Sequence, residues 1–138
     1  MKKRTLISAF SILLLAGPAF AAGTKKTSNE TVSISDSEFC GDVLMNRFSK
    51  RIKKLTNADH NKLIKNLQVS GCAERVGSEV VKKGCAPHLC GIEESIIAIN
   101  TSANTISIGI VTNNDFIYYS ENQNKPSEAI KKYRSEWN

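Results

Sequence analysis

The chain has 138 residues and a formal net charge of +6 at pH 7. This length provides for one domain with one hydrophobic core, and it argues against a second domain. Part of the positive charge lies in the first few residues, so the basic composition does not by itself favour nucleic-acid binding.

Residues 1–21 have the three parts of a secretory signal peptide. A charged start, Met1 to Arg4, precedes the apolar run Leu6 to Ala16, and Ala19-Phe20-Ala21 forms a small-x-small cleavage site. The apolar run is shorter than the about 20 residues that a membrane span needs. We therefore expect cleavage after Ala21 and an exported protein without a stable membrane anchor, in the bacterial periplasm or outside the cell.

Cleavage would lower the net charge because Lys2, Lys3 and Arg4 are removed and no acidic residue is. Nineteen basic residues become sixteen against thirteen acidic ones, so the formal charge falls from +6 to +3. The mature protein is then only mildly basic, and we expect no nucleic-acid partner.

The four cysteines, Cys40, Cys72, Cys85 and Cys90, all follow the predicted signal peptide. An even number in an exported chain indicates two disulfides, although the sequence alone permits three pairings. We favour Cys85 with Cys90, which closes a small ring. That choice leaves Cys40 and Cys72 to join the N-terminal part of the domain to its middle.

Residues 22–36 are polar and are predicted to form a flexible leader to a single domain, residues 37–138. A helical pattern begins at Ser37, because an apolar stripe recurs at spacings of three and four. The stripe comprises Cys40, Leu44, Phe48, Ile52 and Leu55. Cys40 is thus expected on the buried face of the first helix.

The opposite face of this predicted helix is basic, with Arg47, Lys50, Lys53 and Lys54. Helices normally carry charge on the face away from the core, so a solvated surface is the simpler interpretation. The alternative is contact with an anionic partner surface.

A second helix is predicted from about Asp59 to Leu67, with Asn57 as its cap. Its apolar side would contain Leu63, Ile64 and Leu67. Residues 76–83 then favour a strand.

The pattern changes to period two after the ring, which predicts strands at residues 96–100, 106–111 and 116–121. Asn113-Asn114 tolerates positive φ and fits a tight hairpin turn between the last two strands. Pro126 is expected to open a final helix. Its apolar stripe comprises Ala129, Ile130, Tyr133 and Trp137. The fold class is α+β: an antiparallel sheet of about four or more strands, packed by N-terminal helices and a C-terminal helix.

The segment Cys85-Ala86-Pro87-His88-Leu89-Cys90 is the candidate functional site. The proline fixes one backbone angle and a disulfide would fix the ends, so His88 would be displayed with little left to order on binding. A metal site of Cys85, His88 and Cys90, with Cys72 as a further ligand, is disfavoured because export favours disulfides over thiolates.

No enzyme motif is evident in the sequence, and no cofactor is expected. Glu93 and Glu94 are adjacent and would point to opposite faces of a strand, which argues against a paired-carboxylate site. The chemistry that remains is presentation of His88 to a protein partner.

Gly84-Cys85-Ala86-Pro87-His88-Leu89-Cys90-Gly91, followed by the strand Ile96 to Ile99 and another through Gly109, resembles the signature of the Ivy family. Members of that family are periplasmic inhibitors of vertebrate c-type lysozyme. The resemblance implies an antiparallel sheet from which a disulfide-closed loop of the form Cys-Lys-Pro-His-Asp-Cys protrudes. This chain has Ala86 and Leu89 where that pattern has lysine and aspartate.

The resemblance also implies a mechanism. The loop residues Ala86, Pro87, His88 and Leu89 would contact the partner, and His88 would enter the lysozyme cleft and bond the catalytic carboxyl groups. The alternative is a non-inhibitory cell-envelope module with a structural loop. Its partner would bind the basic helix face or a sheet edge.

Overall fold

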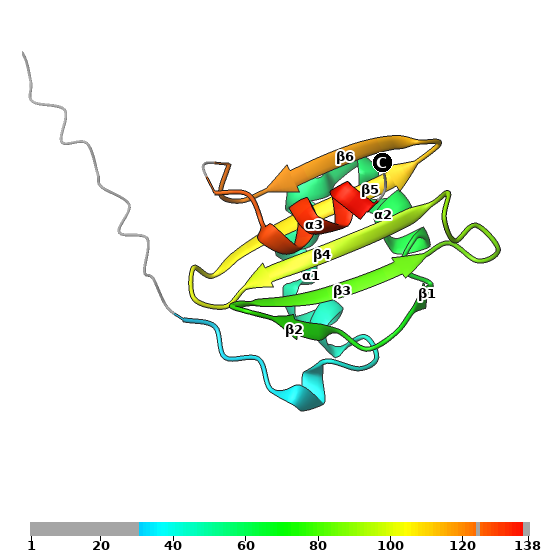
Figure 1. Cartoon of the computed structure of the whole chain (residues 1–138). Helices are drawn as coiled ribbons and strands as arrows, with labels where there is room; N and C mark the ends of the chain where they lie inside the picture. The colour runs from blue at the N-terminus through cyan, green and yellow to red at the C-terminus, as the bar shows by residue number, and fades with distance from the viewer. Residues whose placement is uncertain (1–30, 124, 137–138) are drawn as a thin grey trace, which may run out of the picture.

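The computed structural model describes residues 31–123 and 125–136 (Figure 1). The predicted signal peptide, most of the predicted leader and Trp137 lie outside the described residues.

The described chain forms an α+β fold in which three α-helices pack against one six-stranded antiparallel sheet. The elements are η1 (Asp36–Glu38), α1 (Val43–Thr56), η2 (Asn57–Asp59), α2 (His60–Lys65), β1 (Val69–Ser70), β2 (Glu74–Val76), β3 (Glu79–Cys85), β4 (Glu94–Asn100), β5 (Thr105–Thr112), β6 (Asp115–Ser120) and α3 (Glu128–Glu136). The strand order is β1-β3-β4-β5-β6, and β2 pairs with β3 beside β1. The predicted fold class is confirmed.

The sheet is covered on both faces, with α1 and α2 behind it and α3 in front in Figure 1. Alternate side chains of the central strands face each helix layer. Ile97, Ile99 and the three isoleucines of β5 pack against α1 in the larger core cluster. Val81, Ile96 and Ala98 pack against Ala129 and Ile130 of α3 in the smaller cluster. Within the described residues, no helix is both long and apolar enough to cross a membrane.

The first helix begins later than the sequence pattern indicated. Residues 36–38 form a 3-10 turn with a capping box between Ser35 and Glu38, and α1 starts only at Val43. Gly41, with φ of +69°, lies in the left-handed region and separates the two elements. Cys40 therefore lies in the exposed connection, and its expected place on the buried stripe was wrong.

The predicted flexible leader extended too far along the chain. Ile34 is only 5% exposed and belongs to the main core cluster. The backbone N–H of Val32 also donates to the carbonyl of Thr101 at 2.9 Å. A single isoleucine among polar neighbours forms no periodic apolar pattern. The sequence therefore did not predict that Ile34 belongs to the core.

The segment between α1 and β3 also differs from its prediction. Asn57 is the C-cap of α1 and the first residue of the 3-10 turn η2, so it does not cap the second helix as predicted. The N-cap of α2 is Asp59, and α2 is a six-residue helix ending at Lys65. Leu63 and Leu67 are buried as expected, but Ile64 is 44% exposed. The short strands β1 and β2 were not predicted, because strands of two and three exposed residues carry no alternating apolar pattern.

The strands after the ring match their predictions closely. β4, β5 and β6 pair in the expected meander, with Ile97 opposite Ile108 and Ile110 opposite Ile117. Asn113 and Asn114 have φ of 50° and 68° at the tip of the β5–β6 hairpin. Two successive positive φ values are those of a type I′ turn, so the predicted tight turn is confirmed.

The C-terminal helix is anchored by a buried carboxylate. α3 begins at Glu128, two residues after Pro126, so Pro126 precedes the helix instead of opening it. Glu79 of β3 accepts hydrogen bonds from the Ser127 hydroxyl and the Ala129 backbone N–H, both at 3.0 Å. This carboxylate thus satisfies one of the backbone N–H donors that a helix start leaves free.

Candidate functional site

The candidate site is the connection between β3 and β4, which projects beyond the end of the sheet (Figure 1). Cys85 at the end of β3 pairs with Glu94 at the start of β4, and the loop closes between them. A disulfide joins Cys85 to Cys90, and a second joins Cys40 to Cys72. The fold therefore carries the expected disulfide-closed loop at the tip of two long paired strands.

Backbone hydrogen bonds make the loop rigid from within. The N–H of Leu89 donates to the Ala86 carbonyl at 3.0 Å, which closes a four-residue turn. The N–H of Ala86 donates to the Glu93 carbonyl at 2.9 Å, and the N–H groups of Ile92 and Glu93 both donate to the Leu89 carbonyl. The loop thus retains a fixed shape without a partner.

His88 has a left-handed backbone, with φ of 62°. It follows Pro87 in the turn closed by Leu89 and Ala86, so it holds the third position of a type II turn. Glycine or asparagine usually takes that position, and a histidine there adds strain. His88 is exposed at this turn, so its imidazole is displayed on the loop.

The four predicted contact residues differ in exposure. Pro87 and His88 are exposed and Leu89 is half-buried. The contact of Ala86 with a partner stays a prediction, but its side chain is 0% exposed and faces the interior. The physical reason is its position directly after β3, where it still hydrogen-bonds the opposite strand segment through Glu93.

The base of the loop is tied to helices on both faces of the sheet. Glu93 accepts from Lys65 of α2 at 2.8 Å. Glu94 accepts from the Tyr133 hydroxyl of α3 at 2.5 Å and from the N–H of Gly91 at 2.6 Å. The two adjacent carboxylates point to opposite faces, as predicted. Their role as loop anchors was not predicted, because sequence spacing does not reveal partners on distant helices.

The start of α2 is fixed to the sheet by a further pair. Tyr119 of β6 donates a short hydrogen bond to the Asp59 carboxylate. This bond lowers the pKa of Asp59, and it raises the pKa of Tyr119 to about 12 because ionising the phenol would remove the donor. α2 in turn carries Lys65 to the loop, so the anchor contributes to the position of the loop base.

Cys85 and Cys90 are joined to each other, as are Cys40 and Cys72. A metal site on this loop would need these sulfurs as thiolates, and a disulfide sulfur is not a thiolate ligand. Among the described residues, no cluster of three or more metal-ligating side chains occurs. The loop therefore displays one histidine on a backbone closed by a disulfide.

The basic face of α1 lies apart from the loop, behind the sheet in Figure 1. Arg47 is paired with Glu38 at 2.6 Å and stacks over the Phe48 ring. Lys50, Lys53 and Lys54 are exposed and form no ion pair with any described residue. The structure does not bring this face and His88 into one site.

Together, the fold and the loop define a disulfide-bonded α+β protein that displays one histidine on a rigid, strained turn. The sequence profile of the family described as inhibitor of vertebrate lysozyme (Ivy) matches residues 47–138. This match covers more than half of the chain, so the chain belongs to the Ivy family, and the resemblance carried by the ring is confirmed. Searches of curated proteins and of solved structures gave no match.

The match begins inside α1 and includes the whole sheet and the loop. Cys40 and the 3-10 turn η1 lie before it. The family is one of inhibitors, which agrees with a protein that acts by binding a protein partner.

Proposed function

We propose that the chain is an exported inhibitor of a lysozyme-like glycoside hydrolase, which inserts the Cys85–Cys90 loop into the active-site cleft. The observation that supports this most directly is the backbone of His88. A left-handed histidine at an exposed tip costs stability, and such strain is retained where the displayed group has a task.

The imidazole suits the chemistry of the target. A lysozyme cleft holds two carboxyl groups, one protonated and one ionised. A neutral imidazole carries one N–H donor and one acceptor nitrogen. His88 would donate to the ionised carboxylate and accept from the protonated acid, so both catalytic groups would be engaged by one ring.

Preorganisation would supply much of the affinity. The loop is closed by a disulfide, braced by internal backbone bonds and tied to α2 and α3 through Glu93 and Glu94. A loop that is already ordered loses little entropy when it binds. Such a loop blocks substrate while resisting cleavage, because the cleft cuts glycosidic bonds and not peptides.

The test uses purified mature protein and a c-type lysozyme in a cell-wall lysis assay. We expect inhibition at micromolar concentration or below. His88→Ala should abolish most of it, since the group that meets the carboxyl groups is lost. The matched control is His60→Ala, which removes the only other histidine from the half-buried start of α2.

Absence of inhibition at micromolar protein would overturn the proposed activity. Full inhibition by the His88→Ala protein would overturn the mechanism while leaving the activity standing.

Export to the periplasm is part of the proposal. The signal-like residues 1–21 and the two disulfides support export to an oxidising compartment. Cell fractionation of the expressed chain should recover a protein shortened to begin near Ala22. Recovery of the full-length chain in the cytoplasm would contradict this.

A second candidate function rests on the basic face of α1. Lys50, Lys53 and Lys54 would bind an anionic partner surface in a non-inhibitory envelope module, with the loop serving as structure. Reversing their charges to glutamate should remove that binding. The same change should leave lysozyme inhibition intact if the loop carries the function.

A further inference from the structure

Lys82 is a buried charged residue on the face of β3 that packs against the core. Even-numbered residues of β3 face α1, and Val80 on that face belongs to the main core cluster. Lys82 is only 3% exposed and pairs in register with Ile97, whose side chain is buried. A lysine at such a position breaks the local rule, and departures of this kind are expected at functional sites.

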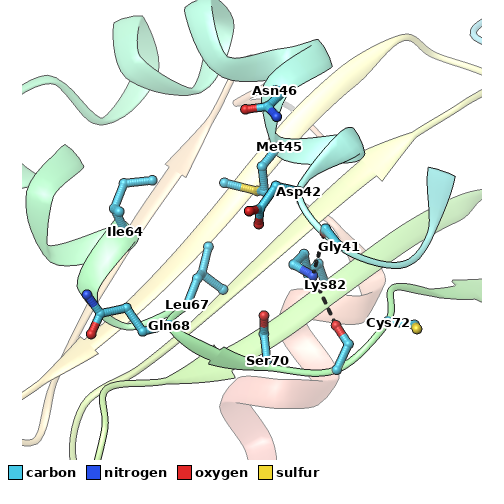
Figure 2. Close-up of a pocket in the computed structure, with 11 residues that line it drawn as sticks. Gly41, Asp42, Met45, Asn46, Ile64, Leu67, Gln68, Ser70, Cys72 and Lys82 are labelled. Carbon is cyan, nitrogen blue, oxygen red and sulfur yellow. Dashed lines mark hydrogen bonds between the residues drawn. The ribbon is translucent and has the colours of Figure 1, made fainter.

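The Lys82 ammonium group is held by two backbone carbonyls. Its Nζ donates to Gly71 O at 3.0 Å and to Gly41 O at 3.3 Å (Figure 2). Gly41 follows Cys40 and Gly71 precedes Cys72, so the Cys40–Cys72 disulfide holds both carbonyls in place.

The Lys82 ammonium group forms no contact ion pair with a carboxylate of the described residues. Among the described residues, no acidic oxygen lies within 4.0 Å of its Nζ. An ammonium group has three N–H donors, and the two carbonyls account for two of them. A buried cation with one remaining donor and no carboxylate in contact with it favours an anionic ligand at that donor.

Lys82 lines an open pocket of about 660 Å³ between the start of α1, the end of α2 and β1 (Figure 2). Met45, Ile64 and Leu67 form its apolar walls, and Asn46 and Ser70 add polar groups. The volume falls within the range typical of small-molecule sites. The exposed side chain of Ile64 is thus part of the pocket wall.

We propose that this pocket binds an organic monocarboxylate that carries a short apolar group. The carboxylate would accept the third N–H of Lys82 and form a contact ion pair with it. The apolar group would cover Met45, Ile64 and Leu67. Asp42 also lines the pocket and would repel a second negative charge, so a monoanion fits better than phosphate. This proposal is independent of His88 and of lysozyme.

The direct experiment titrates the mature, oxidised protein with hexanoate and follows the backbone amides of Asn46 and Ser70 by ¹H–¹⁵N NMR. We expect saturable shifts with a Kd on the order of 1–10 mM, as befits a ligand of this size. Hexan-1-ol, which has a similar chain and no charge, should bind at least about tenfold more weakly. Inorganic phosphate should produce no saturable shift.

Two variants with one matched control locate the interaction. Lys82→Met retains the length of the side chain and should weaken hexanoate binding about tenfold or more. Lys83→Met removes the same charge from the adjacent exposed residue and should leave binding unchanged. Asp42→Asn removes a negative charge from the pocket wall and should tighten hexanoate binding by a few-fold. This variant tests the proposal even if Lys82→Met does not fold.

Several results would overturn the proposal. These are no saturable shift with hexanoate in the wild-type protein, equal binding of hexanoate and hexan-1-ol, or unchanged hexanoate affinity in Lys82→Met. Weaker binding by Asp42→Asn would also contradict it, since the carboxylate of Asp42 would then be helping the ligand.

Discussion

Replacing His88 by glycine and, separately, by alanine tests whether its left-handed backbone is strained. Alanine retains the strain because its Cβ meets the same steric limits as that of histidine, whereas glycine relieves it. Both substitutions remove the imidazole, so both should lose lysozyme inhibition. The two variants differ only in the backbone cost at φ of 62°.

The magnitude follows from two opposing effects. A non-glycine residue in the left-handed region costs about 1–2 kcal/mol. Glycine also lowers the free energy of unfolding by about 0.4–1 kcal/mol, because it increases the conformational freedom of the unfolded chain. The His88→Gly protein should therefore be more stable than His88→Ala by about 0.5–1 kcal/mol, which corresponds to about 2–5 °C in Tm.

The assay is thermal unfolding of the oxidised proteins, with the same pair of substitutions at His60 as the control. His60 has helical angles, φ of −57° and ψ of −42°, so there glycine should be less stable than alanine by about 0.5–1 kcal/mol. The expected signs are thus opposite at the two histidines. Glycine less stable than alanine at both positions would refute the strain argument.

Three further predictions concern the scaffold. Gly109→Ala should destabilise the protein by about 1–3 kcal/mol in urea unfolding, since the new Cβ would lie 2.8 Å from the Phe116 ring. Glu79→Gln should cost about 1–2 kcal/mol and raise amide exchange in α3, because the buried carboxylate holds the start of that helix. Glu38, whose pKa is lowered from 4.5 to about 2 mainly by its bond to the Ser35 backbone, stabilises the fold above pH 4.5, and this contribution is lost as the pH falls towards 2. Glu38→Gln should therefore flatten the stability curve across that interval.

Each of these has a clear opposite result. An unchanged urea midpoint for Gly109→Ala would show that Phe116 moves aside at no cost. Equal amide exchange in Glu79→Gln and in the exposed Glu128→Gln control would show that the buried carboxylate does not anchor α3. Parallel stability curves for wild type and Glu38→Gln between pH 4.5 and pH 2 would contradict the lowered pKa.

The sheet and the ring were predictable because their signals are local. Alternating isoleucines in residues 106–110 define one buried face, and two successive asparagines specify the turn that follows them. The pairing of Cys85 with Cys90 follows from their proximity along the chain.

Features that depend on distant segments were not predictable in this way. α1 begins at Val43, later than predicted, because the left-handed Gly41 separates Cys40 from the helix. Ile34 belongs to the core because of the way the chain folds back, which no periodic pattern indicates. Ala86 was expected at the surface but lies under the turn, since its backbone still belongs to the paired strands.

The pocket around Lys82 was missed for the same reason. In the sequence, Lys82-Lys83 is two adjacent charges, and only the strand register shows that the first faces the core and the second faces solvent. Its carbonyl partners come from segments joined by a disulfide between residues 40 and 72. No spacing rule connects those segments to β3.

Competition for the cleft tests the central claim most directly. Binding of the mature protein to a c-type lysozyme is measured by calorimetry with and without a saturating N-acetylglucosamine trisaccharide, which occupies the cleft. Insertion of the loop that carries His88 predicts that the saccharide lowers the apparent affinity in proportion to its own occupancy. Unchanged affinity in the presence of the saccharide would place the contact outside the cleft and contradict the account.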